Sequence, residues 1–225
     1  MESLRRYPLT YGIIFLNTLF FLLSALQSGN IVDIDLDTLV NLGALYGPLV
    51  VQQGEWWRLL SAMFLHGGMT HILMNMVSLY IIGRGMELYF PKAAYLAIYL
   101  LSGLVGGLLS LYMHPMSVGI GASGAIFGVF GALAGFFLAH RKRIGAYSRE
   151  FMRDFAVILG LNLMLGLSIS SIDMSAHIGG LVTGMVGGYM IARYPRSLPF
   201  FVLFGIIIVI VGAQYLSLNY DQILR

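Results

Sequence analysis

Cysteine is absent from the 225 residues of this chain, and charged residues are scarce. Without cysteine there can be no disulfide, no thiolate metal site and no cysteine nucleophile. Asp, Glu, Lys and Arg make up only 10% of the chain, whereas a soluble domain carries about 25%. Hydrophobic residues account for 58%, and the mean hydropathy is +0.83. The composition therefore predicts an integral membrane protein. Because no polar stretch is long enough to form a soluble domain, we expect one membrane domain over residues 1–225.

Seven stretches are apolar and long enough, or nearly so, to cross a bilayer, which takes roughly 20 residues. The first follows Arg5 and Arg6 and has no clear signal-peptidase site after it, so we expect it to remain in the protein as a helix. The sequence thus predicts an all-α fold, a polytopic membrane helical bundle. The expected spans are about Pro8–Leu26, Thr70–Tyr89, Ala93–Met113, Ser123–Ala139, Phe155–Ile172, His177–Ala192 and Leu198–Leu216.

The basic residues are distributed unevenly between the two sides of this bundle. If the N-terminus is cytoplasmic, only Arg58 and Arg225 lie outside. Cytoplasmic connections are enriched in Lys and Arg, so the pattern predicts a cytoplasmic N-terminus, an outside C-terminus and a place in the cell (plasma) membrane. The net charge of +3 is then a topology signal, and no nucleic-acid partner is expected. The cytoplasmic basic residues would be Arg5, Arg6, Arg84, Lys92, Arg141, Lys142, Arg143, Arg149, Arg153, Arg193 and Arg196.

The fourth and sixth spans begin with polar residues of complementary chemistry, Ser123 and His177, at the same predicted depth. Small residues recur every three or four positions in the fourth span and every four in the sixth, which lets two backbones approach closely in lipid. We predict that these helices pack together and bring the serine and the histidine into hydrogen-bond range as nucleophile and base. The glycines that form these two ridges are Gly124, Gly128, Gly131 and Gly135 in the fourth span, and Gly180, Gly184 and Gly188 in the sixth.

Each of these features also has an ordinary structural explanation. A serine in a membrane helix usually bonds to a backbone carbonyl one turn back. A buried histidine can simply donate to a carbonyl, although ionisable groups at membrane depth are costly and usually functional. The glycine ridges could serve dimerisation instead of packing within one chain. We favour packing within the chain because each ridge begins at one of the two polar residues.

Two further polar residues, His71 and Asn75, lie four apart on one face at the outer end of the second span. They could donate hydrogen bonds to an oxyanion, as could the Ser123 amide at a helix start, where backbone N–H groups are unpaired. The alternative is a helix–helix hydrogen bond worth about 1 kcal/mol.

A zinc site formed by His66, His71 and His177 is the metal alternative. The sequence has no His-Glu-x-x-His pair and no carboxylate at ligand spacing from these residues, so no metal is expected, and no cofactor. Asp173 lies four residues before His177. We expect it to be solvated in a short outer loop and leave it out of a catalytic triad.

Together these motifs resemble the rhomboid family of intramembrane serine proteases, over about Trp57–Ala192. The resemblance implies that Ser123 is the nucleophile and His177 the base of a dyad without an acid. It implies that Asn75, His71 and the Ser123 amide bind the oxyanion, with Gly121 nearby. Phe127 stands where the family often has tyrosine, and we expect its ring to stack on His177. The motifs are Trp57-Arg58, His71-x-x-x-Asn75, Glu87, Gly121-x-Ser123-Gly124 and Ala176-His177-x-Gly179-Gly180 with Gly184 after it.

The resemblance further implies a six-helix core over about residues 8–192 and an extra C-terminal span at about 198–216. The expected function is that of an intramembrane serine endopeptidase, which cuts transmembrane segments of membrane proteins near their outer end. The expected partners are single-span membrane proteins and the lipid bilayer; the oligomeric state and the natural substrate are left open. We expect a hydrated cavity on the outer side, with substrate access beside the fifth span and its outer loop, Ser170–Ser175.

Two other functions must be weighed. An inactive relative would bind membrane helices without cutting them, but the presence of both Ser123 and His177 argues against it. A small transporter or channel would need ionisable groups along a path through the bundle, and these are nearly absent from the predicted spans.

Overall fold

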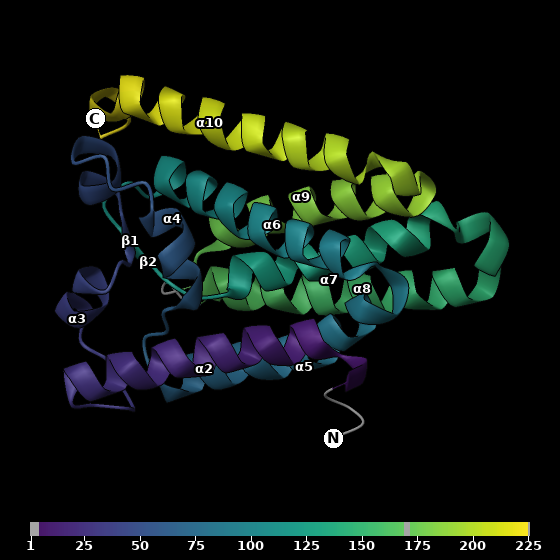
Figure 1. The fold of residues 1–225 in the computed structure, drawn as a ribbon, viewed down its shortest axis with the longest axis horizontal. Helices are drawn as coiled ribbons and strands as arrows, with labels where there is room; N and C mark the ends of the chain where they lie inside the picture. The colour runs from purple at the N-terminus through teal and green to yellow at the C-terminus, as the bar shows by residue number, and fades with distance from the viewer. Residues whose placement is uncertain (1–4, 169–171, 225) are drawn as a thin grey trace.

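The protein is a bundle of long helices, seen in a computed structural model that describes residues 5–168 and 172–224. Figure 1 shows the long helices running along one common direction. This arrangement confirms the all-α class. The long helices are α2 (Pro8–Ser28), α5 (Met69–Tyr89), α6 (Lys92–Met113), α7 (Ser123–Ala139), α8 (Arg141–Ser168), α9 (Met174–Arg193) and α10 (Leu198–Ile223).

The short elements of the first connection, with β2, gather at one end of the bundle, on the left in Figure 1, and one further short turn lies at the other end. Strand β1 (Leu45–Tyr46) pairs antiparallel with β2 (Val118–Gly119), the strand that precedes α7. The pairing joins the long first connection to the loop before Ser123. The other short elements are α3 (Leu36–Asn41), a π-helical turn η1 (Pro48–Gln52), α4 (Arg58–Ser61) and a 3₁₀ turn η2 (Ala62–Phe64) in the first connection, and η3 (Pro195–Ser197) before α10.

Several helices have the length and composition of membrane spans. Among the described residues, α2, α6 and the segment Pro195–Ile223 are both long and apolar enough to cross a bilayer, and α7 is apolar but has 17 residues. The predicted integral membrane protein is supported by these helices. Helices α5 and α9 lie at the predicted positions but carry more polar and small residues, because they supply His71, Asn75 and His177.

Three predicted spans differ from the helices at their ends. The fifth was expected at Phe155–Ile172, but α8 begins at Arg141, with an interruption at Gly145 (φ 18°, ψ −90°). The sixth begins at Met174 instead of His177, and the last continues to Ile223 instead of Leu216. Hydropathy marks where a helix can contact lipid, whereas a helix continues as far as its backbone hydrogen bonds do. The end of the predicted fifth span and part of its outer loop fall on residues 169–171, outside the described residues.

Helices α7 and α9 pack backbone against backbone through their glycines. A Cβ on Gly184 would overlap the backbone of Gly128, and one on Gly180 would overlap the backbone of Gly124. Farther along, Gly188 meets Ala132 in the same way. The predicted packing of the two glycine ridges within one chain is thus confirmed.

Helix α6 also packs against the start of α9, a contact that was not predicted. A Cβ on Gly106 would come within 2.6 Å of the Ala176 carbonyl oxygen, and one on Gly179 within 3.0 Å of the Gly106 Cα. The signal was present in the sequence as Gly103, Gly106 and Gly107, which lie three and four residues apart on one helix face.

Candidate active site

Ser123 and His177 are in direct contact. Ser123 is the first residue of α7, and His177 lies in the first turn of α9. The His177 Nε2 and Ser123 Oγ atoms are 2.8 Å apart, across 54 residues of sequence. In the tautomer with its hydrogen on Nδ1, the imidazole accepts a hydrogen bond from the serine hydroxyl. The predicted contact between the two residues is therefore present, and it lies at the end of the bundle that carries β1 and β2.

The His177 ring is held by packing. The Phe127 ring lies one turn after Ser123 and stacks on the imidazole, with centroids 4.2 Å apart and planes 12° from parallel. This is the stacking predicted from the sequence. The buried Nδ1 atom has no hydrogen-bond partner among the described residues.

Asp173 has a different position from the one predicted. It was expected to be solvated, but its carboxylate is the N-cap of α9 and accepts a hydrogen bond from the Ala176 N–H, at 3.1 Å. The unpaired N–H groups of a helix start draw a nearby carboxylate into this role. The side chain that would complete a triad is therefore used to begin the helix that carries His177.

The loop before Ser123 is fixed at several points. Gly121 has φ +111°, a conformation that side chains rarely adopt, and its N–H donates to the Ala62 carbonyl at 2.9 Å. Earlier in the loop, the Tyr220 hydroxyl near the end of α10 donates to the Pro115 carbonyl at 3.0 Å. With the β1–β2 pairing, these bonds attach the loop to the first connection and to the last helix.

His71 and Asn75 border the same loop. A Cβ on Gly121 would lie 2.7 Å from His71 Nε2 and 3.8 Å from Asn75 Nδ2. The Asn75 amide donates to the His71 carbonyl at 3.1 Å, and the residue is buried. An amide nitrogen carries two hydrogens, so this bond leaves one for a ligand. The three residues predicted to border an oxyanion, Asn75, His71 and Gly121, thus lie together, and Gly121 precedes Ser123 by two residues.

His66 lies next to His71 but does not take part in the contact between Ser123 and His177. The two imidazole rings meet edge to face with centroids 5.1 Å apart, and His66 is fully buried. Within residues 5–168 and 172–224, no group of three or more His, Asp or Glu side chains could hold a metal ion.

Other charged residues have structural roles. Arg58 donates to the Glu55 carboxylate at 2.5 Å and to the Val40 carbonyl at 2.6 Å, which ties together parts of the first connection. Glu87 accepts from the N–H of Thr10 at 2.8 Å and so caps α2. Hydrogen bonds, first from the Ser28 hydroxyl and then from Thr38, lower the pKa of Asp35 to about 2, because they stabilise its charged form.

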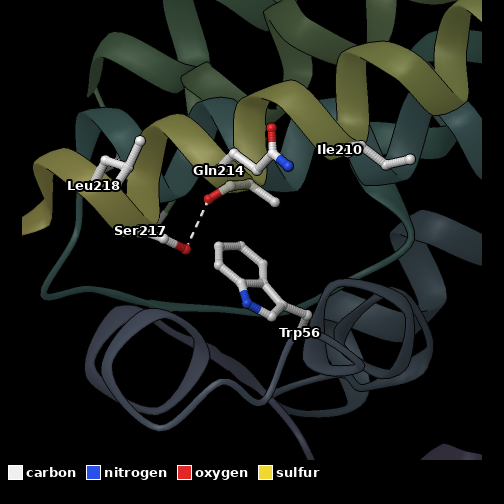
Figure 2. Close-up of a pocket in the computed structure, with 6 residues that line it drawn as sticks. Trp56, Ile210, Gln214, Ser217 and Leu218 are labelled. Atoms are coloured by element: carbon white, nitrogen blue, oxygen red, sulfur yellow. Dashed lines mark hydrogen bonds between the residues drawn. The ribbon is translucent and has the colours of Figure 1, made fainter.

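A cavity of about 510 Å³ separates Trp56 from α10 (Figure 2). Its other lining residues are Ile210, Ala213, Gln214, Ser217 and Leu218, and they do not include Ser123 or His177. The Ser217 hydroxyl donates to the Ala213 carbonyl of its own helix at 3.0 Å. This cavity is therefore separate from the serine–histidine pair.

The fold and the site together define a class: a multi-pass helical membrane protein with a serine–histidine contact at the ends of two helices. Residues 53–194 match the family model for the Rhomboid domain, which is more than half of the chain. The chain belongs to the rhomboid family.

Relatives with curated names cover most of this chain. Rhomboid protease GluP of Bacillus subtilis is 39% identical over 78% of the chain and 33% of its own length. RHOMBOID-like protein 6, mitochondrial, of Arabidopsis thaliana is 38% identical over 71% and 52%, respectively. YdcA of Bacillus subtilis, named as a candidate rhomboid protease, is 32% identical over 83% of the chain and 90% of its own length. The match thus spans from a third to nine tenths of these relatives.

Proposed function

We propose that this protein is an intramembrane serine endopeptidase that hydrolyses transmembrane segments of other membrane proteins through Ser123 and His177. The observation that carries the proposal is the 2.8 Å contact between Ser123 Oγ and His177 Nε2, in a membrane protein of the rhomboid family. Membership of a family that includes named proteases supports the reaction class.

In the proposed reaction, the Ser123 oxygen attacks the carbonyl carbon of the scissile peptide while His177 Nε2 takes the hydroxyl proton. The peptide carbonyl becomes a tetrahedral oxyanion. The Ser123 N–H, the free hydrogen of the Asn75 amide and His71 would donate to it, because all three border the Gly121 loop. Held donors of this kind stabilise the charge without reorganisation.

The intermediate then collapses, and His177 gives its proton to the leaving amine as the C–N bond breaks. A water molecule next attacks the acyl-serine ester with His177 as base, which releases the acid and restores the serine hydroxyl. No carboxylate is required to hold the imidazole in this scheme, because stacking on Phe127 fixes the ring.

The substrate we propose is a single-span membrane protein, cut near the outer end of its span. A helix shields its carbonyls within its own hydrogen bonds, so the segment must unwind locally before attack. Access beside α8 is favoured because side chains there face outward, with Val157 57% and Leu161 56% exposed. A hydrated cavity open to the outer side would supply the water.

The direct test is labelling by a serine-directed fluorophosphonate together with cleavage of a single-span substrate in vesicles. The wild type should be labelled by the fluorophosphonate and should cleave the substrate. Ser123→Ala should do neither. His177→Ala should also lose cleavage, because a nucleophile and its base act as one unit. Both variants should still fold and insert, so their circular dichroism spectra and their insertion into vesicles should match those of the wild type. Cleavage well above an uncatalysed control by either folded variant would contradict the dyad, and a wild type that binds substrate without cutting it would be an inactive relative.

We further propose that the N-terminus is cytoplasmic, the C-terminus is outside and the protein resides in the plasma membrane. Eleven of the 13 Lys and Arg residues lie cytoplasmic in this orientation. The chain has no cysteine, so single cysteines can test it. Because Met116 and Tyr147 are 57% and 62% exposed, Met116→Cys should react with an impermeant maleimide from outside in intact cells. Tyr147→Cys should react only after lysis, and the reverse pattern would invert the topology.

A further inference from the structure

The junction between α7 and α8 contains a second candidate site, at the opposite end of the bundle from the serine. It is a cavity of about 370 Å³ lined by Leu138, Arg141, Lys142, Gly145, Ser148, Arg149 and Met152. Fifteen residues of α7 separate Ser123 from Leu138, about 22 Å along a helix. The cavity is therefore remote from the site already described.

The walls of this cavity are of two kinds. Three exposed cationic groups come from Arg141, Lys142 and Arg149. The apolar lining comes from Leu138 at the end of α7 and Met152 one turn after Arg149. The hydroxyl of Ser148, another lining residue, donates to the Phe137 carbonyl at 2.8 Å, which attaches α8 to α7.

In the described part of the chain, the three cationic side chains that line the cavity are not paired with a carboxylate. The acidic residues nearest in sequence, Glu150 and Asp154, are both within salt-bridge distance of Arg153, at 4.0 and 2.8 Å. Within the described part of the chain, Arg141, Lys142 and Arg149 form no salt bridge. Three positive charges around the cavity are therefore free to bind an external anion.

We propose that this cavity binds an anionic phospholipid of the adjacent leaflet, with its phosphate among Arg141, Lys142 and Arg149 and an acyl chain along Leu138 and Met152. Basic pockets between membrane helices are suited to acidic headgroups, and Leu138 and Met152 offer apolar contacts for an acyl chain in the same cavity. The general excess of basic residues on one side of a membrane protein accounts for the charges at this end. It does not account for a cavity that three of them line together with apolar side chains.

Native mass spectrometry of the intact protein in detergent can measure this binding, with dioctanoyl phosphatidylglycerol as the anionic probe. The test variant is Arg141→Gln/Lys142→Gln/Arg149→Gln. Its matched control, Arg143→Gln/Arg193→Gln/Arg196→Gln, removes the same charge from the same end but from residues that do not line the cavity. Wild type and control should bind the first lipid with equal affinity. The test variant should bind it on the order of 100-fold more weakly, from three lost cationic contacts.

Two further probes identify the source of the anion. Dioctanoyl phosphatidylcholine should bind much more weakly than phosphatidylglycerol, and inorganic phosphate should neither bind at similar affinity nor displace the lipid. Equal loss in both triple variants would mean non-specific attraction and would overturn the site. Phosphate that competes as well as the lipid would overturn the lipid assignment. Thermal unfolding without lipid should be the same for both variants, which separates loss of binding from loss of fold.

Discussion

Helix α7 touches α9 through bare backbone and touches α8 through aromatic rings. Beyond the Phe127–His177 ring stack, the backbones of α7 and α9 meet directly at glycines, as at Gly128 and Gly184. On the α8 side, Phe137 stacks on Phe151 with centroids 3.9 Å apart, and Phe130 meets Phe155 at 4.4 Å. A backbone contact leaves no side chain that could rearrange, whereas a ring contact can change when its side chains change rotamer.

Helix α7 therefore has a rigid interface with α9 and a more adaptable interface with α8. The 2.8 Å contact between Ser123 and His177 spans the glycine interface, where small displacements are sterically blocked. The aromatic contacts with α8 lie farther from Ser123 along α7, and beyond them Gly160 has open space around it. We therefore expect α8 to be displaced from α7 more easily than α9 is.

The largest effect should come from a side chain forced into the glycine interface. Gly184→Val should destabilise the protein by about 3 kcal/mol or more, at the upper end of overpacking, because the obstacle is the backbone of Gly128. Activity should be lost as α7 and α9 separate. Thermal unfolding in detergent and cleavage of a single-span substrate measure the two effects.

The matched control is Gly160→Val in α8, where an added Cβ meets nothing within 4 Å. Its stability should stay within about 0.5 kcal/mol of the wild type. If Gly184→Val and Gly160→Val lost similar amounts of stability, the difference inferred between the α9 and α8 interfaces of α7 would be contradicted.

A smaller effect is expected from the oxyanion donor. Asn75→Ala should lower kcat by roughly 10- to 1000-fold with little change in KM, because the lost hydrogen bond acts in the transition state. Steady-state kinetics measure the split. Asn219→Ala is the control, since Asn219 donates to the Tyr215 carbonyl at 2.9 Å in the same way that Asn75 bonds to His71. If Asn75→Ala changed KM alone, Asn75 would be a substrate contact.

The smallest effect should come from the aromatic contact. Phe155→Ala should cost about 1–3 kcal/mol of stability, less than in a soluble core, because lipid can fill the vacated space. The turnover number should not fall, since the dyad lies across the other interface. Phe204→Ala, at a ring that is 60% exposed on α10, serves as the control in the same unfolding and kinetic assays. A fall in kcat like that of Asn75→Ala would mean that α8 positions the pair.

The features that could be predicted from the sequence are those that produce a local sequence pattern. The facing glycines and the matched starts of two spans predicted the contact between Ser123 and His177, because close packing in lipid depends on small residues. Phe127 was placed on His177 by the resemblance to a family. The start of α8 was missed because Arg141–Asp154 is too charged for a hydropathy pattern, although it is helical.

Contacts between distant segments carried no such signal. The β1–β2 pair is only two residues long on each side, too short for a period-two pattern. The bond from Tyr220 to Pro115 joins residues 105 apart and depends on the path of the whole chain. Asp173 was placed in solvent because the start of α9 was set at His177, three residues too late for its cap to be recognised.

The Tyr220 bond also has a consequence for the order of biogenesis. A chain is synthesised and inserted from its N-terminus, so Ser123 and His177 leave the ribosome before Tyr220 does. The hydrogen bond from the Tyr220 hydroxyl to the Pro115 carbonyl, which holds the loop before Ser123, can form only after α10 has been made and packed. Completion of the loop before Ser123 therefore follows the synthesis of α10.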